Sequence, residues 1–159
     1  MSNPYLLQEI DDVSIEFNTE KGLRYKVYFI DQSLLFQEYP DIASLMFSLN
    51  IDVIEGNPDD SQEDERVGDT IWMILQQFFA NSDNAVLYVC DSLDGRHLGR
   101  KRKFDRWFWR YDDGSIIKQD SSLADEDQDI LSAILVHKEN PNIISILDAF
   151  NELTEISGK

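Results

Sequence analysis

The sequence predicts one α+β domain, residues 1–159, with a mixed or mostly antiparallel sheet and about four helices. Short strand patterns separated by turn residues open the chain, and helical patterns of apolar residues are interspersed among the later strands. The length of 159 residues fits a domain of ordinary size, and a hydrophobic content of 42% is enough to build a core. No repeat and no Pro/Gly/Ser-rich linker divides the chain.

The first elements form a predicted hairpin. Apolar and polar residues alternate from Val13 to Phe17, as in a half-buried strand, and a turn is expected at residues 20–22. Leu23 to Ile30 then forms the second strand of the hairpin. Leu34 to Tyr39 adds a short strand that Pro40 ends.

The middle of the chain alternates between helix and strand. Asp41 is expected to cap a helix over residues 42–49, and a strand follows at residues 51–54. After an acidic loop at residues 57–66, with Ser61 as its N-cap, a helix runs to about Ala80. Its buried stripe is predicted to be Val67, Ile71, Ile74, Leu75 and Phe78.

The next elements surround the most distinctive segment. Residues 85–90 are a continuous apolar run, which is typical of a central strand buried on both faces. Asp94 is expected to cap a basic helix, and alternating aromatic residues predict a strand at 107–111. A hairpin turn at residues 112–114 and a returning strand at 115–119 complete this region.

A second acidic loop is expected at residues 120–129, before a last strand at 130–136. Asn140 and Pro141 form a typical helix start, so the final helix runs from there to about Leu153. Its predicted core residues are Ile143, Ile144, Leu147 and Phe150.

Charge is sharply segregated along the sequence. The net charge is −17, from 31 acidic residues against 14 lysines and arginines. Seven of those 14 cations lie between Arg96 and Arg110, opposed there by Asp105 alone. Two interpretations stay open: the acidic segments at 59–65 and 120–129 neutralise this basic segment within the chain, or it binds an external anionic partner.

The external interpretation gives a candidate anion- or nucleic-acid-binding site in the basic segment. Arginine side chains bind phosphate or carboxylate through two parallel hydrogen bonds, and a tryptophan offers a stacking surface for a base. The candidate residues are Arg96, Arg100, Arg102, Arg106 and Trp107.

Catalytic and metal-binding signatures are weak. Asp91 and Asp94 follow the apolar strand, where two carboxylates could hold a magnesium ion. We favour a capping role, of a turn by Asp91 and of a helix by Asp94, because acidic residues dominate the loops throughout this chain. Cys90, His97 and His137 are too few and too far apart for a structural zinc site. Cys90 closes the apolar strand, so we interpret it as an inert core residue. We therefore expect no cofactor and assign no catalytic residue.

The sequence also bears on where the protein acts. No apolar run approaches the roughly 20 residues of a membrane span, and the first residues lack the features of a signal peptide. A single cysteine cannot form an intrachain disulfide. We therefore expect a cytoplasmic protein with no membrane association.

Two segments carry a resemblance to a known family. One comprises residues 89–96 (VCDSLDGR) and continues through Arg100, Arg102, Phe104, Trp107 and Phe108; the other is the opening hairpin, with Phe17, Thr19, Tyr25, Val27 and Phe29. This pattern resembles a family of small uncharacterised proteins of the Bacteroidetes, known as a domain of unknown function. The resemblance covers nearly the whole chain and implies a bacterial, single-domain, cytoplasmic protein. It implies no activity and no catalytic residues.

Three functions follow, in decreasing order of preference. The first is a non-enzymatic acidic binding protein, partner-inhibiting in the manner of antitoxins or immunity proteins, whose protein partner is basic. The second is binding of a nucleotide or nucleic acid through residues 96–110. The third is a metal-dependent phosphoryl-transfer enzyme that uses Asp91 and Asp94. The oligomeric state is left open.

Overall fold

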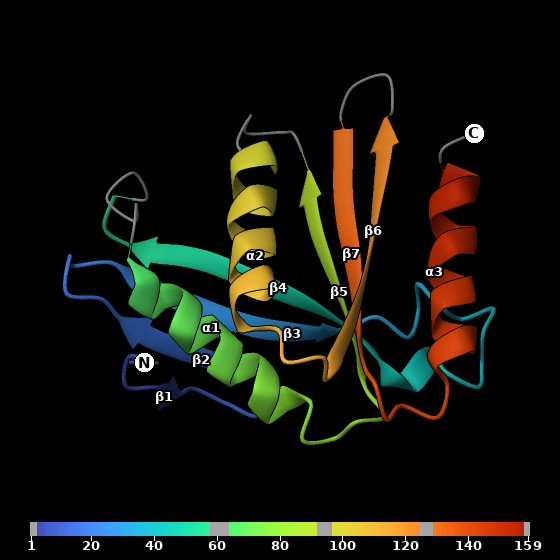
Figure 1. The fold of residues 1–159 in the computed structure, drawn as a ribbon, viewed down its shortest axis with the longest axis horizontal. Coiled ribbons are helices and arrows are strands. Elements are labelled where there is room, and N and C mark those ends of the chain that lie inside the picture. Colours follow the sequence, from blue (N-terminus) through green and yellow to red (C-terminus); the bar gives the residue numbers. More distant parts are fainter. Residues whose placement is uncertain (1–2, 58–63, 92–96, 125–128, 158–159) are drawn as a thin grey trace. The chain divides into compact units, whose positions relative to one another are not determined.

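The computed structural model describes residues 3–57, 64–91, 97–124 and 129–157 (Figure 1). The hydrogen-bonded strand order is β1-β2-β3-β4-β5-β7-β6. The four strand pairs β1–β2, β2–β3, β5–β7 and β6–β7 are antiparallel. The α+β class with a mostly antiparallel sheet is confirmed, whereas the expected four helices are one too many, since the described residues form three α-helices.

The chain divides into two compact units, which are described separately. The first comprises residues 1–30 and 49–78, and the second comprises residues 31–48 and 79–159. The strand β4 (Met46–Glu55) begins in the second unit and ends in the first. The prediction that residues 1–159 form a single domain stays a prediction.

The first unit contains the predicted hairpin. Its strands are β1 (Gln8–Glu9), β2 (Ser14–Asn18) and β3 (Arg24–Asp31), and β2 pairs with β3 so that Phe17 faces Tyr25. The expected turn is present, with Gly22 at a φ of 84°, a conformation that glycine adopts without strain. The hairpin prediction is confirmed.

Aromatic stacking and one amphipathic helix hold the first unit together. The ring of Phe17 stacks on Tyr5 and Tyr25, with centroid distances of 6.0 and 5.1 Å. Helix α1 (Glu65–Phe78) buries four residues of its predicted stripe. These are Val67, Ile71, Ile74 and Leu75. Phe78 is less buried but stacks on Phe29 at 4.0 Å, and the predicted N-cap, Ser61, lies outside the described residues.

Two predictions between the hairpin and α1 are wrong. Residues 34–39 form turns rather than a strand, with the Tyr39 amide donating to the Phe36 carbonyl at 2.8 Å. Residues 42–49 form no α-helix: a short 3-10 helix η1 (Ala43–Leu45) leads directly into β4. The four-residue spacing of Ile42 and Met46 suggested a helix, but both side chains reach the same core across the 3-10 turn. The strand predicted at 51–54 lies within β4.

The second unit is built on β5 (Ala85–Asp91), β7 (Asp129–His137) and β6 (Ile116–Ala124), in that order. The apolar run at 85–90 is confirmed as an interior strand. Leu87 pairs with Ile134, and Tyr88 with Ala133. Because successive side chains point to opposite faces, the sheet presents two apolar faces to be covered.

Helix α3 (Ile143–Ser157) covers the face of Leu87. The buried residues of this core include Ala85, Leu87, Ile134 and Val136 of the strands and Ile146, Ala149 and Phe150 of the helix. The helix begins two residues later than predicted: Asn140 Oδ1 accepts a hydrogen bond of 2.7 Å from the Asn142 amide in the preceding turn, and the Asn142 carbonyl accepts one of 2.9 Å from the Ile146 amide. The predicted packing of Ile144 is wrong, because this side chain is 76% exposed.

Helix α2 (His97–Tyr111) covers the face of Tyr88, on whose ring Phe104 stacks at 4.1 Å. Figure 1 shows α2 and α3 on either side of the three strands. The strand predicted at 107–111 is wrong, because Phe104, Phe108 and Tyr111 recur at helical spacing on the side facing the sheet. That packing overrides the alternation of aromatic residues.

The connections of α2 and β6 also differ from expectation. Gly114 has the expected positive φ, 86°, but its turn joins α2 to β6 rather than two strands. Residues 120–124 and 129 belong to β6 and β7, so the predicted acidic loop over 120–129 is wrong in extent. None of the helices in the described ranges combines the length and the apolar character that a membrane span requires.

Candidate functional site

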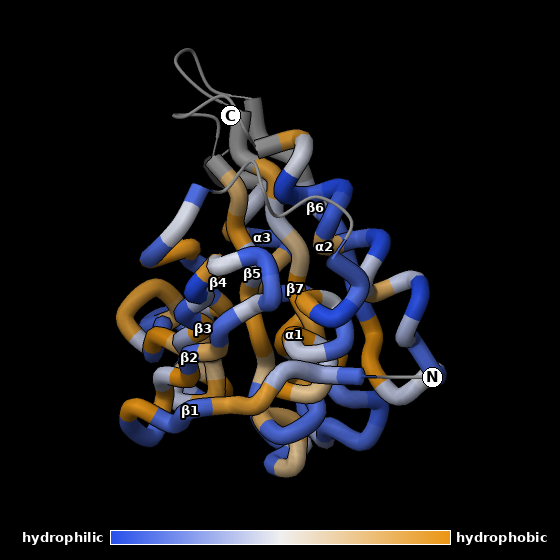
Figure 2. The backbone as a smooth tube through the Cα atoms, turned by 90° about the vertical axis from the view of Figure 1, so that its left-hand side faces the viewer, coloured by the Kyte–Doolittle hydropathy of each residue, from blue (hydrophilic) through white to orange (hydrophobic). Residues whose placement is uncertain are grey.

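Helix α2 carries the basic segment from Arg100 to Arg110 and is largely hydrophilic in the hydropathy colouring of Figure 2. Its 3.6-residue period sorts the side chains into three stripes. The inner stripe is Lys101, Phe104, Phe108 and Tyr111, and the outer stripe is Arg102, Arg106 and Trp109. The third stripe is Arg100, Lys103, Trp107 and Arg110. The inner stripe is mostly aromatic, whereas the outer and third stripes each combine cations with a tryptophan.

The inner stripe fixes α2 to the sheet through packing and charge. Phe104 is 2% exposed and stacks on Tyr88. One turn away, Lys101 is buried although it carries a positive charge. A buried ammonium is costly unless it is paired and hydrogen-bonded, so its partners define the local architecture.

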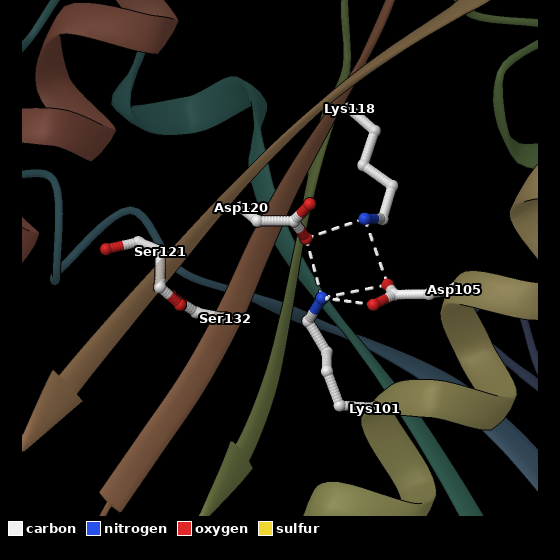
Figure 3. A network of polar contacts seen from close by, with 6 residues as sticks. All are labelled: Lys101, Asp105, Lys118, Asp120, Ser121 and Ser132. Carbon is white, nitrogen blue, oxygen red and sulfur yellow. Dashed lines mark hydrogen bonds and ion pairs between the residues drawn. The ribbon is translucent and has the colours of Figure 1, made fainter.

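Those partners form a quartet of two lysines and two aspartates, Lys101, Asp105, Lys118 and Asp120 (Figure 3). Lys101 Nζ lies 2.8 Å from Asp105 Oδ1 and 2.6 Å from Asp120 Oδ1. Lys118 Nζ lies 2.9 Å from Asp105 Oδ1 and 2.6 Å from Asp120 Oδ1. Each ammonium therefore lies between the same two carboxylates, and the charges of the lysine–aspartate quartet cancel.

The contacts within the quartet favour the charged forms of Lys101 and Asp120. Burial acts against the charged form of Lys101, but hydrogen bonds to Asp105 and Asp120 outweigh it and raise the Lys101 pKa. Burial likewise opposes the Asp120 carboxylate, but hydrogen bonds from Lys101 and Lys118 lower its pKa. A lysine with a raised pKa is a poor nucleophile or base at neutral pH, so the quartet has a structural role.

The outer stripe presents a different surface. Trp109 is 86% exposed, and Arg102 and Arg106 are exposed beside it. Within the described ranges, neither arginine forms an ion pair. The stripe borders a concavity of about 620 Å³ between α2 and β6, which we call the α2–β6 concavity. Its lining residues are Arg102, Asp105, Arg106, Phe108 and Trp109 of the helix and Lys118 and Asp120 of the strand.

The structure separates the predicted anion-binding residues. Arg102 and Arg106 lie together on the outer stripe, whereas Arg100 lies on the third stripe and is half-buried. Trp107 is also half-buried there, with Lys103 Nζ 5.6 Å from its ring centroid. Arg96 lies outside the described residues. The predicted set is therefore not one site in the described part of the chain.

The predicted set of five anion-binding residues did not include Trp109, Lys118 or Asp120. Trp109 stands seven residues after Arg102, a spacing that would have joined it to the arginines had the helix been extended past residue 106. Lys118 and Asp120 come from β6, and only the strand register brings them to α2. The expectation that acidic residues of the same chain neutralise part of the basic segment holds for Lys101 and Asp120.

Metal ligation finds no support in the part of the chain that the structure describes, where no three His, Cys, Asp or Glu residues gather. Asp94 lies outside the described residues, and Asp91 is placed only as the end of β5. Cys90 is a buried free cysteine, as predicted. The weak candidates for magnesium ligands, Asp91 and Asp94, thus stay untested.

A second concavity, of about 460 Å³, lies in the first unit beside β1. Its cation, Arg66, forms an ion pair of 2.8 Å with Glu20 and donates to the Asn3 carbonyl. The Arg66 guanidinium also covers the Tyr5 ring at 3.9 Å. These contacts use Arg66 internally, so this concavity offers less for a ligand than the α2–β6 concavity.

Comparisons with known proteins complete the description of the site. A family of unknown function, DUF6169, matches residues 63–152, which are more than half of the 159 residues and include α2, β6 and β7. No curated protein matches at a significant level. Among solved structures, the chain is similar to the CoA-dependent acyl-homoserine lactone synthase MesI, with 11% identity and a TM-score of 0.40. That alignment covers 94% of this chain and 71% of the synthase chain, and it is too weak to carry a conclusion about activity.

Proposed function

We propose that this chain, which belongs to the DUF6169 family, is a non-enzymatic binding protein that recognises another protein through the outer stripe of α2. The observation that carries this proposal is Trp109, 86% exposed between solvent and the α2–β6 concavity, with Arg102 and Arg106 on the same stripe. Tryptophan and arginine dominate the binding energy of protein interfaces. A solvent-exposed tryptophan beside two exposed arginines fits such an interface.

A protein partner fits this surface better than a nucleic acid does. Asp105 and Asp120 line the same concavity as the arginines, so a phosphate backbone would meet carboxylates there. Lys101 and Lys118 are already paired with those carboxylates and add no net charge. The whole chain, at −17, also repels polyanions. Nucleotide or nucleic-acid binding through residues 96–110 is therefore the second candidate.

The partner that we propose differs in charge at the point of contact from the basic protein that the sequence led us to expect, and neither charge has been tested. The net charge favours a basic partner, as in antitoxins and immunity proteins, but the exposed cations of the outer stripe favour carboxylates at the point of contact. The proposal therefore has the partner present acidic side chains to α2. An inhibitory role for this binding remains part of the proposal.

Affinity capture tests the proposal. Wild-type protein and an Arg102→Glu/Arg106→Glu variant are used as baits in a lysate of the organism that makes the protein, with and without nuclease. The matched control, Lys21→Glu/Lys138→Glu, makes the same change in net charge at exposed cations outside α2. We expect a specific protein, insensitive to nuclease, to be retained by wild type and the control and reduced about tenfold for the α2 variant.

Trp109→Ala supplies an independent check, with Ile144→Ala as its control at another exposed apolar side chain. Truncating exposed Trp109 should change the free energy of unfolding by less than about 0.5 kcal/mol. If the Trp109→Ala variant no longer retains the partner, the cause is therefore the lost contact and not misfolding. Equal retention by all variants would contradict the proposed function, and material that nuclease removes would replace it with nucleic-acid binding.

A further inference from the structure

We propose that the partner binds in an extended conformation, adding a strand to the outer edge of β6 and directing acidic side chains toward Arg102 and Arg106. This inference rests on the proposed function and specifies its binding mode and partner chemistry. It depends on three properties of the second unit: the end position of β6, the direction of its backbone groups and the location of the α2–β6 concavity.

The first property is the position of β6 at the end of the strand order. The strand has nine residues and pairs with β7 along one edge. In the described part of the chain, no strand pairs with its other edge. Such an edge presents unpaired N–H and C=O groups, and peptide recognition by strand addition uses these groups.

The second property is which backbone groups point outward. The Lys138 amide donates to the Ser115 carbonyl at 2.8 Å, so the pair of Ser115 and Lys138 is of the hydrogen-bonded type. Hydrogen-bonded pairs alternate along an antiparallel ladder, so Gln119 also bonds toward β7. The N–H and C=O groups of Lys118 and Asp120 therefore point to the outer edge, available to another strand.

The third property is the location of the concavity. Lys118 pairs with Leu135 and Asp120 with Ala133, which places their side chains on the sheet face that α2 covers. Both side chains line the α2–β6 concavity together with the outer stripe. A strand added to β6 would thus direct every second side chain over this concavity, in front of α2.

The charges around the concavity favour acidic side chains on the added strand. Each carboxylate of the quartet is already shared by two lysines, at 2.6 to 2.9 Å. Arg102 and Arg106 remain as the exposed cations, and they are spaced one helical turn apart. Trp109 and Phe108 offer apolar surface next to them. The favoured occupant is a segment in which acidic residues alternate with β-branched ones.

The quartet also limits what can pair with β6. Charged side chains on an edge strand discourage indiscriminate pairing. A second copy of this acidic chain would bring another charge of −17, and self-repulsion opposes it. The geometry therefore points to a different protein as the source of the strand.

The probe is a fluorescent synthetic peptide of about ten residues, the length of an ordinary strand, in which glutamate alternates with valine. One control peptide replaces glutamate with lysine. The other control peptide carries N-methyl groups on every second amide. These groups block hydrogen bonding to a strand edge and leave the charge of the peptide unchanged. Binding is measured by fluorescence anisotropy with wild type, Arg102→Glu/Arg106→Glu and the Lys21→Glu/Lys138→Glu control.

We expect the glutamate peptide to bind wild type and the Lys21→Glu/Lys138→Glu control alike. The α2 variant, the lysine peptide and the N-methylated peptide should each weaken binding at least tenfold. Residue-resolved amide exchange gives the second readout: the amides of Lys118 and Asp120 should slow on binding, whereas the Gln119 amide, already bonded to β7, should change little.

Outcomes separate this inference from the proposed function. Unchanged exchange at Lys118 and Asp120, equal binding of the N-methylated peptide or no peptide binding would overturn strand addition, while retention of a partner through α2 would keep the proposed function. Self-association in analytical ultracentrifugation that protects the same amides would assign the edge to a second copy and also overturn the inference. Failure of the capture experiment alone would overturn the proposed function.

Discussion

Lys101 of α2 and Lys118 of β6 add little to the exposed positive charge of the site, because both are paired with carboxylates. Their side chains are each 10% exposed, and both ammonium groups contact Asp105 and Asp120. Pairs of this kind replace lost hydration only if the geometry is good and the hydrogen bonds are satisfied. The quartet meets both conditions, so it joins α2 to β6 while it leaves Arg102 and Arg106 as the exposed charges of the site.

Asp120→Asn should reduce stability in a pH-dependent way. The mutation removes charged hydrogen bonds to two nearly buried ammonium groups. Because the Asp120 side chain is 55% exposed, we discount the effect to about 1 kcal/mol of unfolding free energy at pH 7. The Asp120 pKa is lowered in the folded protein, so its contribution is complete above the ordinary aspartate value of about 4 and is lost as the pH falls below it.

Urea unfolding of wild type and Asp120→Asn between pH 7 and pH 3 measures this contribution. The difference between the two proteins should be largest at neutral pH and shrink as the pH falls below about 4. Asp41→Asn, at an exposed aspartate in a turn, serves as the control and should show little difference at any pH. A difference for Asp120→Asn that stays constant down to pH 3 would rule out the ion pairs as its source.

At the scale of elements, the length of α2 determines which residues form the candidate site. Alternating aromatic residues at 107–111 predicted a strand, yet the inner stripe of Phe104, Phe108 and Tyr111 continues the helix to Tyr111. The same continuation carries Trp109 to the side of Arg102 and Arg106. An error in one element therefore left Trp109, which is 86% exposed, out of the predicted set that contained Arg102 and Arg106.

Gly99 of α2 offers a test of this helix. A Cβ added at Gly99 would meet no heavy atom within 4 Å, and its φ is not in the positive range that disfavours other residues. Gly99→Ala should therefore stabilise the protein by about 0.5–1 kcal/mol, since alanine restricts the unfolded chain and favours helix. Urea unfolding measures this gain. Destabilisation by Gly99→Ala would contradict a continuous helix at this position.

For other elements, the local sequence is enough to predict the secondary structure. The hairpin of β2 and β3, helix α1 and strand β5 were predicted because their side-chain periods match their burial. The structure of residues 42–49 was not predicted correctly. Ile42 and Met46 have the spacing of a helix, but the backbone turns from η1 into β4 there. The contact of Lys101 with Asp120 also depends on strand register, which a single sequence does not determine.

At the scale of the whole molecule, the net charge of −17 opposes the compact state by self-repulsion. Salt screens this repulsion, with a Debye length near 10 Å at 0.1 M and about 3 Å at 1 M. Salt also weakens attractive pairs, but the quartet is half sheltered from solvent and is screened less. Repulsion among the many exposed carboxylates should therefore dominate the salt dependence.

We accordingly expect the free energy of unfolding in urea at pH 7 to rise by about 1 kcal/mol between 0.02 and 0.5 M NaCl. The Arg102→Glu/Arg106→Glu variant, with more negative charge, should show a steeper rise than wild type. Partner binding through the two arginines should weaken over the same range, because it is an attraction between exposed charges. Opposite salt dependences of stability and binding would separate the charge of the whole chain from that of the outer stripe. A fall in stability with salt would instead show that attractive ion pairs outweigh the net charge.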